Sequence, residues 1–234
     1  GLPPASWVAR IEASPHAAGT AFVAVDRHRD DDFSPHVFKT TDFGKSWTSL
    51  RGNLPPVGYA QVIREDPRVP NLLYVGTELG IFASWDGGQR WASIRNNIPP
   101  VSVRDIKVHP REHDLIVGTH GRGIYILDDM TALRELGPAM RGELYVFDVR
   151  PATRWQMWGR DASLGFKTYA AQNPPYGALI TFFLKADSRD PAVLTVTDAS
   201  GRRVREIRRA DPKAGLNRVA WDLRFEAPRP AESE

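Results

Sequence analysis

The stretch Thr40-Thr41-Asp42-Phe43-Gly44-Lys45-Ser46-Trp47 has a second copy in this chain, Ser84-Trp85-Asp86-Gly87-Gly88-Gln89-Arg90-Trp91. Both copies follow the pattern [ST]-x-D-x-G-x-x-W, and their tryptophans lie 44 residues apart. An aspartate in a turn can accept hydrogen bonds from the backbone N–H groups that follow it, and glycine tolerates positive φ. Each copy is therefore predicted to be a β-hairpin whose returning strand carries a tryptophan that fills the gap to a neighbouring sheet. The residues with this predicted structural role are Asp42, Gly44, Trp47, Asp86, Gly88 and Trp91.

The motif belongs to a larger repeat with three copies. The first runs from Trp7 to Pro56 and the second from Ala60 to Pro100, while the third begins at Val103. The third copy reaches Asp128-Asp129 without the glycine and the tryptophan of the motif. Each copy contains apolar runs of about five residues, separated by Pro or Gly turns, which predict short strands. A repeat of this length, built of strands, is typical of the blades of a β-propeller.

Three blades cannot close a propeller. Closed propellers have at least about four blades, and each blade buries its face only against the next one. We therefore expect residues 1–136 to be about three blades at the C-terminal end of an incomplete propeller, with the missing blades upstream of Gly1. The segment Met130–Leu136 has the apolar spacing of a short helix and is followed by Gly137-Pro138, where we expect the helix to end.

Residues 137–234 have a different pattern. They contain short strand-like runs with turn signals between them and no further helical spacing, which predicts a β-sandwich of the immunoglobulin or fibronectin kind. The predicted strands are 144–149, 178–184, 192–197, 203–207 and 215–224, with a turn at 198–201. The whole chain is accordingly predicted to be all-β.

Composition excludes several classes of protein. The chain has no cysteine, which excludes disulfides and thiolate metal sites but leaves the compartment open. No apolar run approaches the roughly 18 residues of a membrane span. The net charge is +3, and no aromatic residues are interleaved with the one dense basic cluster, so we expect a solvated face and no nucleic-acid partner. That cluster is Arg202, Arg203, Arg205, Arg208 and Arg209.

A ligand-binding face follows from the geometry of a blade. The innermost strand starts at one face of the disc, the turn between the second and third strands returns to it, and the Asp motif lies at the opposite face. The residues that share the first face are Tyr59, Gln61, Glu78, Arg104, Asp105, His120 and Arg122. Glu78 and His120 each follow a Gly-Thr pair in consecutive blades and could act as acid and base, or bind a sugar or a peptide. The alternative is that both side chains only hold their own glycine-rich turns by hydrogen bonds.

Two groups of residues have some features of a metal site. His109 and His113 have the spacing of helical zinc ligands, but Pro110 interrupts a helix and no third ligand is evident. His28 lies among Asp26, Asp30, Asp31 and Asp32, an acidic loop without the alternating pattern of a calcium site. We read both as structural or solvated loops and predict no metal and no cofactor.

The motif strings resemble known families. The [ST]-x-D-x-G-x-x-W motif resembles the Asp box of the bacterial neuraminidase repeat, found in sialidases and sortilin-type receptors, where it is structural. The strings from Tyr74 to Gly88 and from Gly118 to Asp129 resemble large bacterial sortilin-type repeat proteins, often labelled glycosyl hydrolases. The residues from Val196 to Asp222 resemble immunoglobulin-like modules of bacterial secreted proteins and of the flagellar hook-cap protein. Such modules usually have one more strand after the Trp-Asp pair, so we expect the last strand to be absent here.

These resemblances imply a function in general terms. They imply a secreted or periplasmic protein in which the blades and the immunoglobulin-like module serve protein or glycan recognition, without catalysis by this chain itself. The alternative is part of a glycoside hydrolase, of the sialidase or xyloglucanase kind, whose catalytic carboxylates lie mostly on the missing blades. No catalytic residue is assigned. The expected partners are the missing blades and a glycan or protein ligand.

Overall fold

The computed structural model describes residues 1–4, 6–156 and 172–226. The fold is all-β, as predicted, with several antiparallel sheets and a single α-helix in the described residues. The chain divides into two compact units, Gly1–Met130 and Thr131–Glu234. The division falls before the helix, whereas the sequence grouped residues 131–136 with the blades.

The first two repeats form two four-stranded antiparallel sheets, each in simple sequential strand order. A short 3-10 turn, η1 (His28–Asp30), lies between the second and third strands of the first sheet. The first sheet consists of β1 (Trp7–Ala13), β2 (Ala21–Arg27), β3 (Asp32–Thr40) and β4 (Thr48–Ser49). The second consists of β5 (Ala60–Glu65), β6 (Leu73–Thr77), β7 (Gly80–Ser84) and β8 (Ala92–Ser93).

The third repeat forms a sheet of three strands only, β9 (Val103–Val108), β10 (Leu115–Thr119) and β11 (Ile124–Leu127). Within the described residues no fourth strand follows β11. The reason is local, because Asp128-Asp129 lacks the glycine and the tryptophan that complete the hairpin in the first two repeats.

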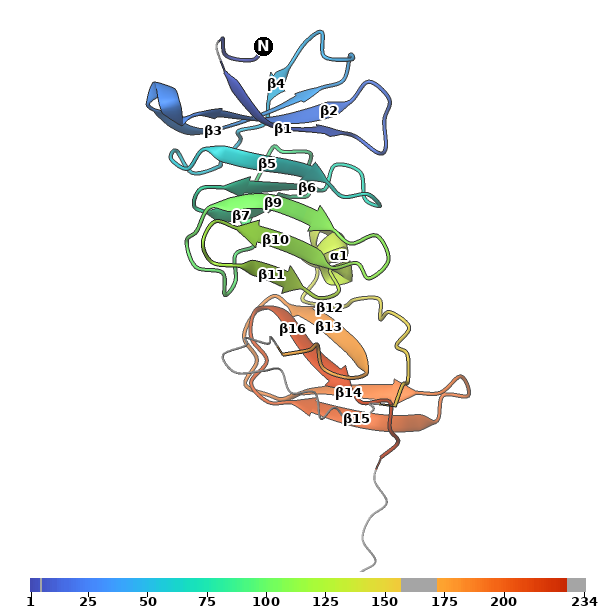
Figure 1. Ribbon diagram of the computed structural model, residues 1–234. Coiled ribbons are helices and arrows are strands. Elements are labelled where there is room, and N and C mark those ends of the chain that lie inside the picture. Colours follow the sequence, from blue (N-terminus) through green and yellow to red (C-terminus); the bar gives the residue numbers. More distant parts are fainter. Residues whose placement is uncertain (5, 157–171, 227–234) are drawn as a thin grey trace, which may run out of the picture. The chain divides into compact units, whose positions relative to one another are not determined.

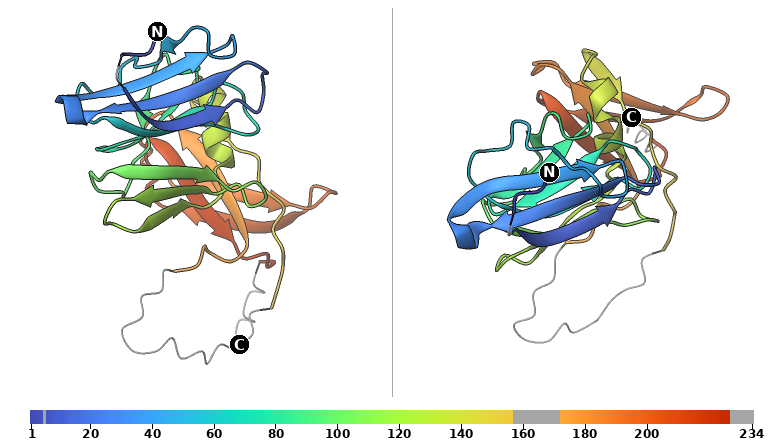
Figure 2. Two further views of the ribbon diagram at one scale, coloured as in Figure 1. Left: turned by 45° about the horizontal axis from the view of Figure 1, so that its top comes forward. Right: turned by 90° about the horizontal axis from the view of Figure 1, so that it is seen from above.

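The three sheets of the first unit are stacked one after another, with β5 beside both β1 and β9 (Figure 1; the same order is visible in Figure 2). One hydrophobic cluster fills the space between the first and second sheets. The first sheet and its following loop supply Phe22, Ala24, Val37, Leu50 and Leu54, and the second supplies Ala60, Ile63, Leu73, Val75 and Trp91. Each sheet thus buries an apolar face against the next, as blades of a propeller do.

Trp91 connects the second sheet to the first both by the packing of its ring and by hydrogen bonds. Its side chain is 5% exposed, and its indole Nε1–H donates a hydrogen bond of 2.8 Å to the Leu50 carbonyl. The Trp91 N–H donates to Asn53 Oδ1 at 2.6 Å, and Asn53 Nδ2 donates back to the Trp91 carbonyl at 3.0 Å. The loop that follows the first sheet therefore holds both the ring and the backbone of this tryptophan.

The second and third sheets approach closely at Gly76. A Cβ at this position would lie 2.6 Å from methyl groups of both Val62 and Val103. Only glycine leaves room for β9 to pack against β6 at this point.

In its described residues, the second unit contains a helix and five strands. The strands form two antiparallel sheets, with the order β12-β13-β16 in one and β14-β15 in the other. The elements are α1 (Thr131–Ala139), β12 (Leu144–Val146), β13 (Ala178–Leu184), β14 (Ala192–Thr197), β15 (Arg203–Arg209) and β16 (Gly215–Trp221). Residues of both sheets, among them Ile180, Leu194 and Trp221, line an apolar cavity of about 630 Å³.

The predicted end of the helix is wrong. Helix α1 continues through Gly137 and Pro138 to Ala139. Its last residue is 1% exposed and packs in one cluster with Ala132 and Phe147. Pro138 is the next-to-last residue of the helix, where few helical hydrogen bonds remain for a proline to interrupt, and Ala139 is buried beside it.

Three arginines of the basic cluster pair within their own hairpin, and Arg205 contacts Glu226 at 3.9 Å. Arg202 contacts Asp198 at 3.1 Å, and Arg203 and Arg208 contact Glu206 at 3.2 and 3.0 Å. These arginine side chains are largely exposed, so the pairs contribute little to stability.

In the described part of the chain, no helix has the length and hydrophobicity that crossing a membrane requires.

We predict that Trp91→Ala destabilises the first unit by about 3–5 kcal/mol, because it removes a buried aromatic ring and leaves the space unfilled. Hydrogen exchange of the β5 and β6 backbone amides measures this loss of stability. Those amides are protected only while the second sheet is packed against the first. Trp155→Ala is the matched control, because Trp155 is 58% exposed. Equal effects of the two substitutions would contradict the role given to Trp91.

Candidate functional site

The innermost strand of each sheet begins with the same irregularity. The pairing register shifts between Val8 and Arg10 in β1 and between Ala60 and Val62 in β5, and one extra residue also lies in β9 opposite Gly118 and Thr119. A β-bulge of this kind re-aims the side chain of the extra residue. The extra residues in β5 and β9 are Gln61 and Arg104, and Arg104 Nη1 donates a 3.0 Å hydrogen bond to Gln61 Oε1.

The turn after the second strand brings one polar residue to the same edge in each sheet. Asp26 pairs with Trp7 at the start of β1. The Glu78 N–H donates to the Tyr59 carbonyl at 3.1 Å, and the His120 N–H donates to the Ser102 carbonyl at 2.8 Å. Asp26, Glu78 and His120 therefore occupy equivalent positions in three consecutive sheets.

The turns beside Glu78 and His120 are held by threonines. Thr77 Oγ1 donates to the Gly80 carbonyl at 3.2 Å and accepts from the Leu79 N–H at 3.1 Å. Thr119 Oγ1 donates to the Gly123 carbonyl at 2.6 Å. These threonine hydroxyls supply hydrogen bonds within both turns.

Tyr59 lies at the centre of this edge. It is 6% exposed, and burial raises the pKa of its hydroxyl, as do the charge of Glu78 and a hydrogen bond to that carboxylate. Arg104 acts in the opposite direction on the pKa of Tyr59 but does not cancel the rise. The imidazole of His28 stacks on the Tyr59 ring, with a centroid distance of 4.7 Å and an interplanar angle of 23°.

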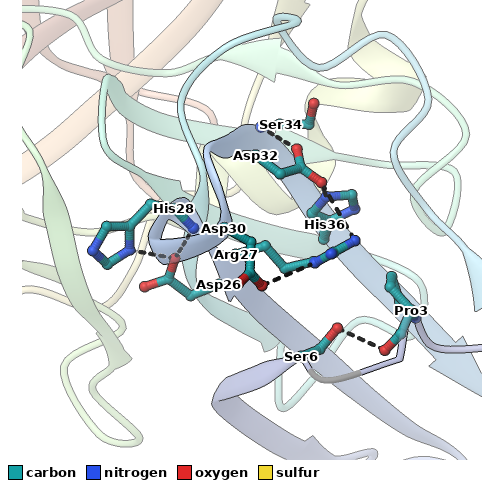
Figure 3. A network of polar contacts seen from close by, with 9 residues as sticks. All are labelled: Pro3, Ser6, Asp26, Arg27, His28, Asp30, Asp32, Ser34 and His36. Atoms are coloured by element: carbon teal, nitrogen blue, oxygen red, sulfur yellow. Dashed lines mark hydrogen bonds and ion pairs between the residues drawn. The ribbon is translucent and has the colours of Figure 1, made fainter.

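His28 is oriented by Asp26. Asp26 Oδ1 lies 2.6 Å from His28 Nδ1 and also accepts the His28 backbone N–H at 2.9 Å (Figure 3). In a neutral imidazole this contact assigns the proton to Nδ1 and leaves Nε2 as a hydrogen-bond acceptor. We call the set that these contacts connect the polar edge. It comprises Asp26, His28, Tyr59, Gln61, Glu78 and Arg104.

Asp26 and His28 are absent from the residues predicted for this face. The sequence contained a signal for Asp26, which follows the apolar run 21–25 as Glu78 follows the apolar run of the second repeat. In the structure the rest of the acidic loop around His28 pairs internally (Figure 3): Asp32 contacts His36 at 2.7 Å and Arg27 at 3.7 Å. The His36 hydrogen bond is the main cause that holds the pKa of Asp32 below its usual value.

Other predicted residues lie differently. Asp105 Oδ1 contacts Arg10 Nη2 and Arg64 Nη2, each at 3.0 Å, and Arg64 also pairs with Glu12. This network ties together β1, β5 and β9. The side chains of His120 and Arg122 are exposed at the third sheet's turn. Within the described ranges, no three His, Asp or Glu side chains are grouped as metal ligands, and His109 Nδ1 instead accepts the Glu112 N–H at 3.0 Å.

The two Asp motifs lie at the opposite ends of the strands from the polar edge. Asp42 accepts hydrogen bonds from the Ser46 hydroxyl at 2.6 Å, the Ser46 N–H at 2.9 Å and the Thr40 hydroxyl at 2.8 Å. These bonds lower the pKa of Asp42 from 3.8 to about 2. Burial raises the pKa of Asp86, but hydrogen bonds from the Arg90 N–H, the Ser84 hydroxyl and the Gln89 N–H together lower it below its usual value.

No family model matches this chain, and no curated protein matches it. Among solved structures, an ancestral GH74 enzyme aligns with 52% of this chain at 25% identity and a TM-score of 0.42. A GH74 xyloglucanase from Xanthomonas campestris aligns with 90% of this chain at 13% identity and 0.40, and YCF48 bound to D1 peptide with 56% at 15% and 0.37. The chain spans 15%, 29% and 44% of these three structures, respectively. The neighbours are β-propeller proteins. Because the TM-scores are low, we transfer no residue role from them.

We predict that Asp42→Asn removes part of the acid sensitivity of the first unit. The folded-state pKa of Asp42 is depressed, so its contribution to stability is fully present above pH 3.8 and is lost as the pH falls toward about 2. The measurement is urea unfolding at a series of pH values across this range. Ser46→Ala, which removes the largest single cause of the shift, should give an intermediate result. An unchanged pH dependence of unfolding in the Asp42→Asn variant would contradict the assignment.

We also predict that Glu78→Gln lowers the pKa of Tyr59 toward its ordinary value of 10.0, because the substitution removes a negative charge that opposes tyrosinate. Ultraviolet difference titration measures tyrosinate formation, and Tyr59→Phe identifies the signal. An unchanged Tyr59 titration in Glu78→Gln would show that Glu78 does not contribute to the raised pKa of Tyr59.

Proposed function

We propose that this chain is part of an exported, secreted or periplasmic, β-propeller protein and recognises a glycan or a protein surface through the polar edge. The first unit is taken as three blades and the second as an immunoglobulin-like module. In this proposal the chain binds its ligand without catalysing a reaction.

The observation that carries the proposal is the convergence of side chains from three sheets at one edge. The first sheet contributes Asp26 and His28, the second Tyr59, Gln61 and Glu78, and the third Arg104. A few polar groups that are fixed in direction around a buried aromatic ring are typical of a binding site. Residues so far apart in sequence meet only because the sheets repeat one geometry.

The hydrogen-bonding capacity of the polar edge suits a ligand rich in hydroxyls or amides. His28 Nε2 and the Glu78 carboxylate accept, whereas Arg104 donates. Gln61 Nε2 is a further donor, which is buried and has no partner within the described structure. A buried amide nitrogen without a partner is costly, so an acceptor atom of a ligand or of water would stabilise it.

A glycoside hydrolase remains the second candidate, since Asp26 and Glu78 are two carboxylates at one edge. Glycosidases use a pair of carboxyl groups about 5–10 Å apart, one of which is free to donate a proton. Here Asp26 is engaged with His28, and Glu78 interacts with Tyr59. Release of reducing ends from β-glucan or xyloglucan by the chain would favour this candidate over binding alone.

The proposal is tested on a glycan array and on arrayed peptides. We expect Glu78→Ala, His28→Ala and Arg104→Ala each to weaken binding by about tenfold, which corresponds to about 1.4 kcal/mol. Because the side chain of His120 lies exposed at the next sheet's turn, His120→Ala reports whether the ligand extends that far. Lys185→Ala is the control, as it removes only an exposed ion pair with Glu143 in the second unit. Unchanged binding in all variants would exclude the polar edge as the site.

A further inference from the structure

At β1 the first sheet leaves uncovered part of an apolar face that its counterparts bury. Ile11, Ile63 and Ile106 occupy the same register position on β1, β5 and β9, opposite Val23, Val75 and Val117. Ile63 and Ile106 are 0% exposed, whereas Ile11 is 61% exposed. The same residue type at the same position is therefore buried in two sheets and open in the first.

The second sheet shows what covers such an isoleucine. Ile63 lies in one cluster with Phe22 and Val37, which belong to the preceding sheet. Because the sheets repeat one geometry, Ile11 faces the place where a sheet preceding the first would lie. Val8, which pairs with Val25 on the same face as Ile11, is 43% exposed.

The tryptophan of each Asp motif packs in the same cluster as a leucine of the loop that precedes its own sheet. Trp91 packs in a cluster with Leu54, which begins the Leu54-Pro55-Pro56 loop after the preceding sheet. Trp47 is half-buried and packs, together with Leu2, against the cluster of Val23, Val25 and Phe38. Leu2 begins the sequence Leu2-Pro3-Pro4, a copy of the loop on which Trp91 rests.

The spacing of this loop agrees as well. Leu54 lies six residues before Ala60, and Leu2 lies six residues before Val8, which holds the equivalent place in β1. Gly1 stands where Asn53 stands, so the side-chain clamp that Asn53 makes on Trp91 has no counterpart on Trp47. Leu2-Pro3-Pro4 thus has the sequence, the spacing and the tryptophan contact of a loop that follows a sheet.

We propose that the uncovered face of the first sheet is the docking surface for one more four-stranded antiparallel sheet of the same polypeptide, whose final loop is Leu2-Pro3-Pro4. The docked sheet is assigned to the same polypeptide because its final loop, Leu2-Pro3-Pro4, is covalently joined to β1. The third sheet of a second copy would not supply a four-stranded sheet, because no fourth strand pairs with β11 in the described residues. The inference rests on the propeller architecture of the proposed function and not on its ligand.

The docked sheet has a defined sequence signature. Trp47 lies seven residues before Leu54, and Trp91 lies seven residues before Ile98. Asp42 and Asp86 lie twelve residues before the same positions. The coding sequence upstream of Gly1 is therefore expected to encode the [ST]-x-D-x-G-x-x-W motif with its tryptophan seven residues before Leu2. An upstream sequence without this motif and without strand patterning would overturn the proposal.

Hydrogen exchange on the full-length polypeptide tests the docking itself. We expect the backbone amides of β1 and of Trp47 to exchange as slowly as those of β5 and of Trp91, because both joints are then covered. In the 234-residue chain the β1 amides should exchange faster than those of β5. Fast exchange of β1 in the full-length polypeptide would overturn the proposal without any substitution.

A pair of variants distinguishes docking of an upstream sheet from dimerisation and from the proposed ligand binding. Ile11→Asp should lower the thermal midpoint of the full-length polypeptide by about 5 °C or more and leave that of the 234-residue chain unchanged. Ile126→Asp is the matched control, because Ile126 is 57% exposed on β11. A dimer of the 234-residue chain that Ile11→Asp dissociates would overturn the assignment to the same polypeptide. Loss of ligand binding with intact docking would contradict the proposed function alone.

Discussion

The burial of one apolar face between successive sheets is the constraint on which the first unit depends. Each sheet alone would expose its apolar faces to water, because a meander of three or four strands covers neither of them. The joint at Trp91 shows how the burial is fixed in place: the ring fills the space between sheets, while Leu50 and Asn53 satisfy its polar atoms. A joint with both apolar area and directed hydrogen bonds holds neighbouring sheets at a defined register.

The polar edge is a consequence of that register. Each innermost strand begins with a bulge and each second strand ends in a turn at the same height, so stacking the sheets brings these positions side by side. Asp26 and His28 meet Tyr59 across the boundary between the first two sheets, and Arg104 meets Gln61 across the next. The opposite ends of the strands carry the Asp motifs, whose aspartates are occupied by their own turns. The polar edge and the Asp motifs therefore lie at opposite ends of each sheet.

Much of the fold could be predicted because it depends on local pattern. The alternation of short apolar runs with Pro and Gly turns located the strands, and the spacing of Asp, Gly and Trp located the hairpins. The predicted end of helix α1 was wrong, because Gly137-Pro138 does not reveal the tertiary cluster in which Ala139 is buried. In the candidate site, Glu78 and Tyr59 could be placed from strand ends, whereas the partners of Asp105 could not. Its ion pairs with Arg10 and Arg64 depend on how three sheets pack.

The sequence by itself determined that this protein is built of repeated antiparallel β-hairpins with a tryptophan on the returning strand, since hairpins depend on turn chemistry and on the period of two in a strand. Only the tertiary structure decided which polar residues meet. His28 stacks on Tyr59 and is oriented by Asp26, although nothing in the spacing of these residues requires it. The physical reason is that the packing of the apolar faces sets how neighbouring sheets are placed. That placement determines which side chains at the edge come into contact.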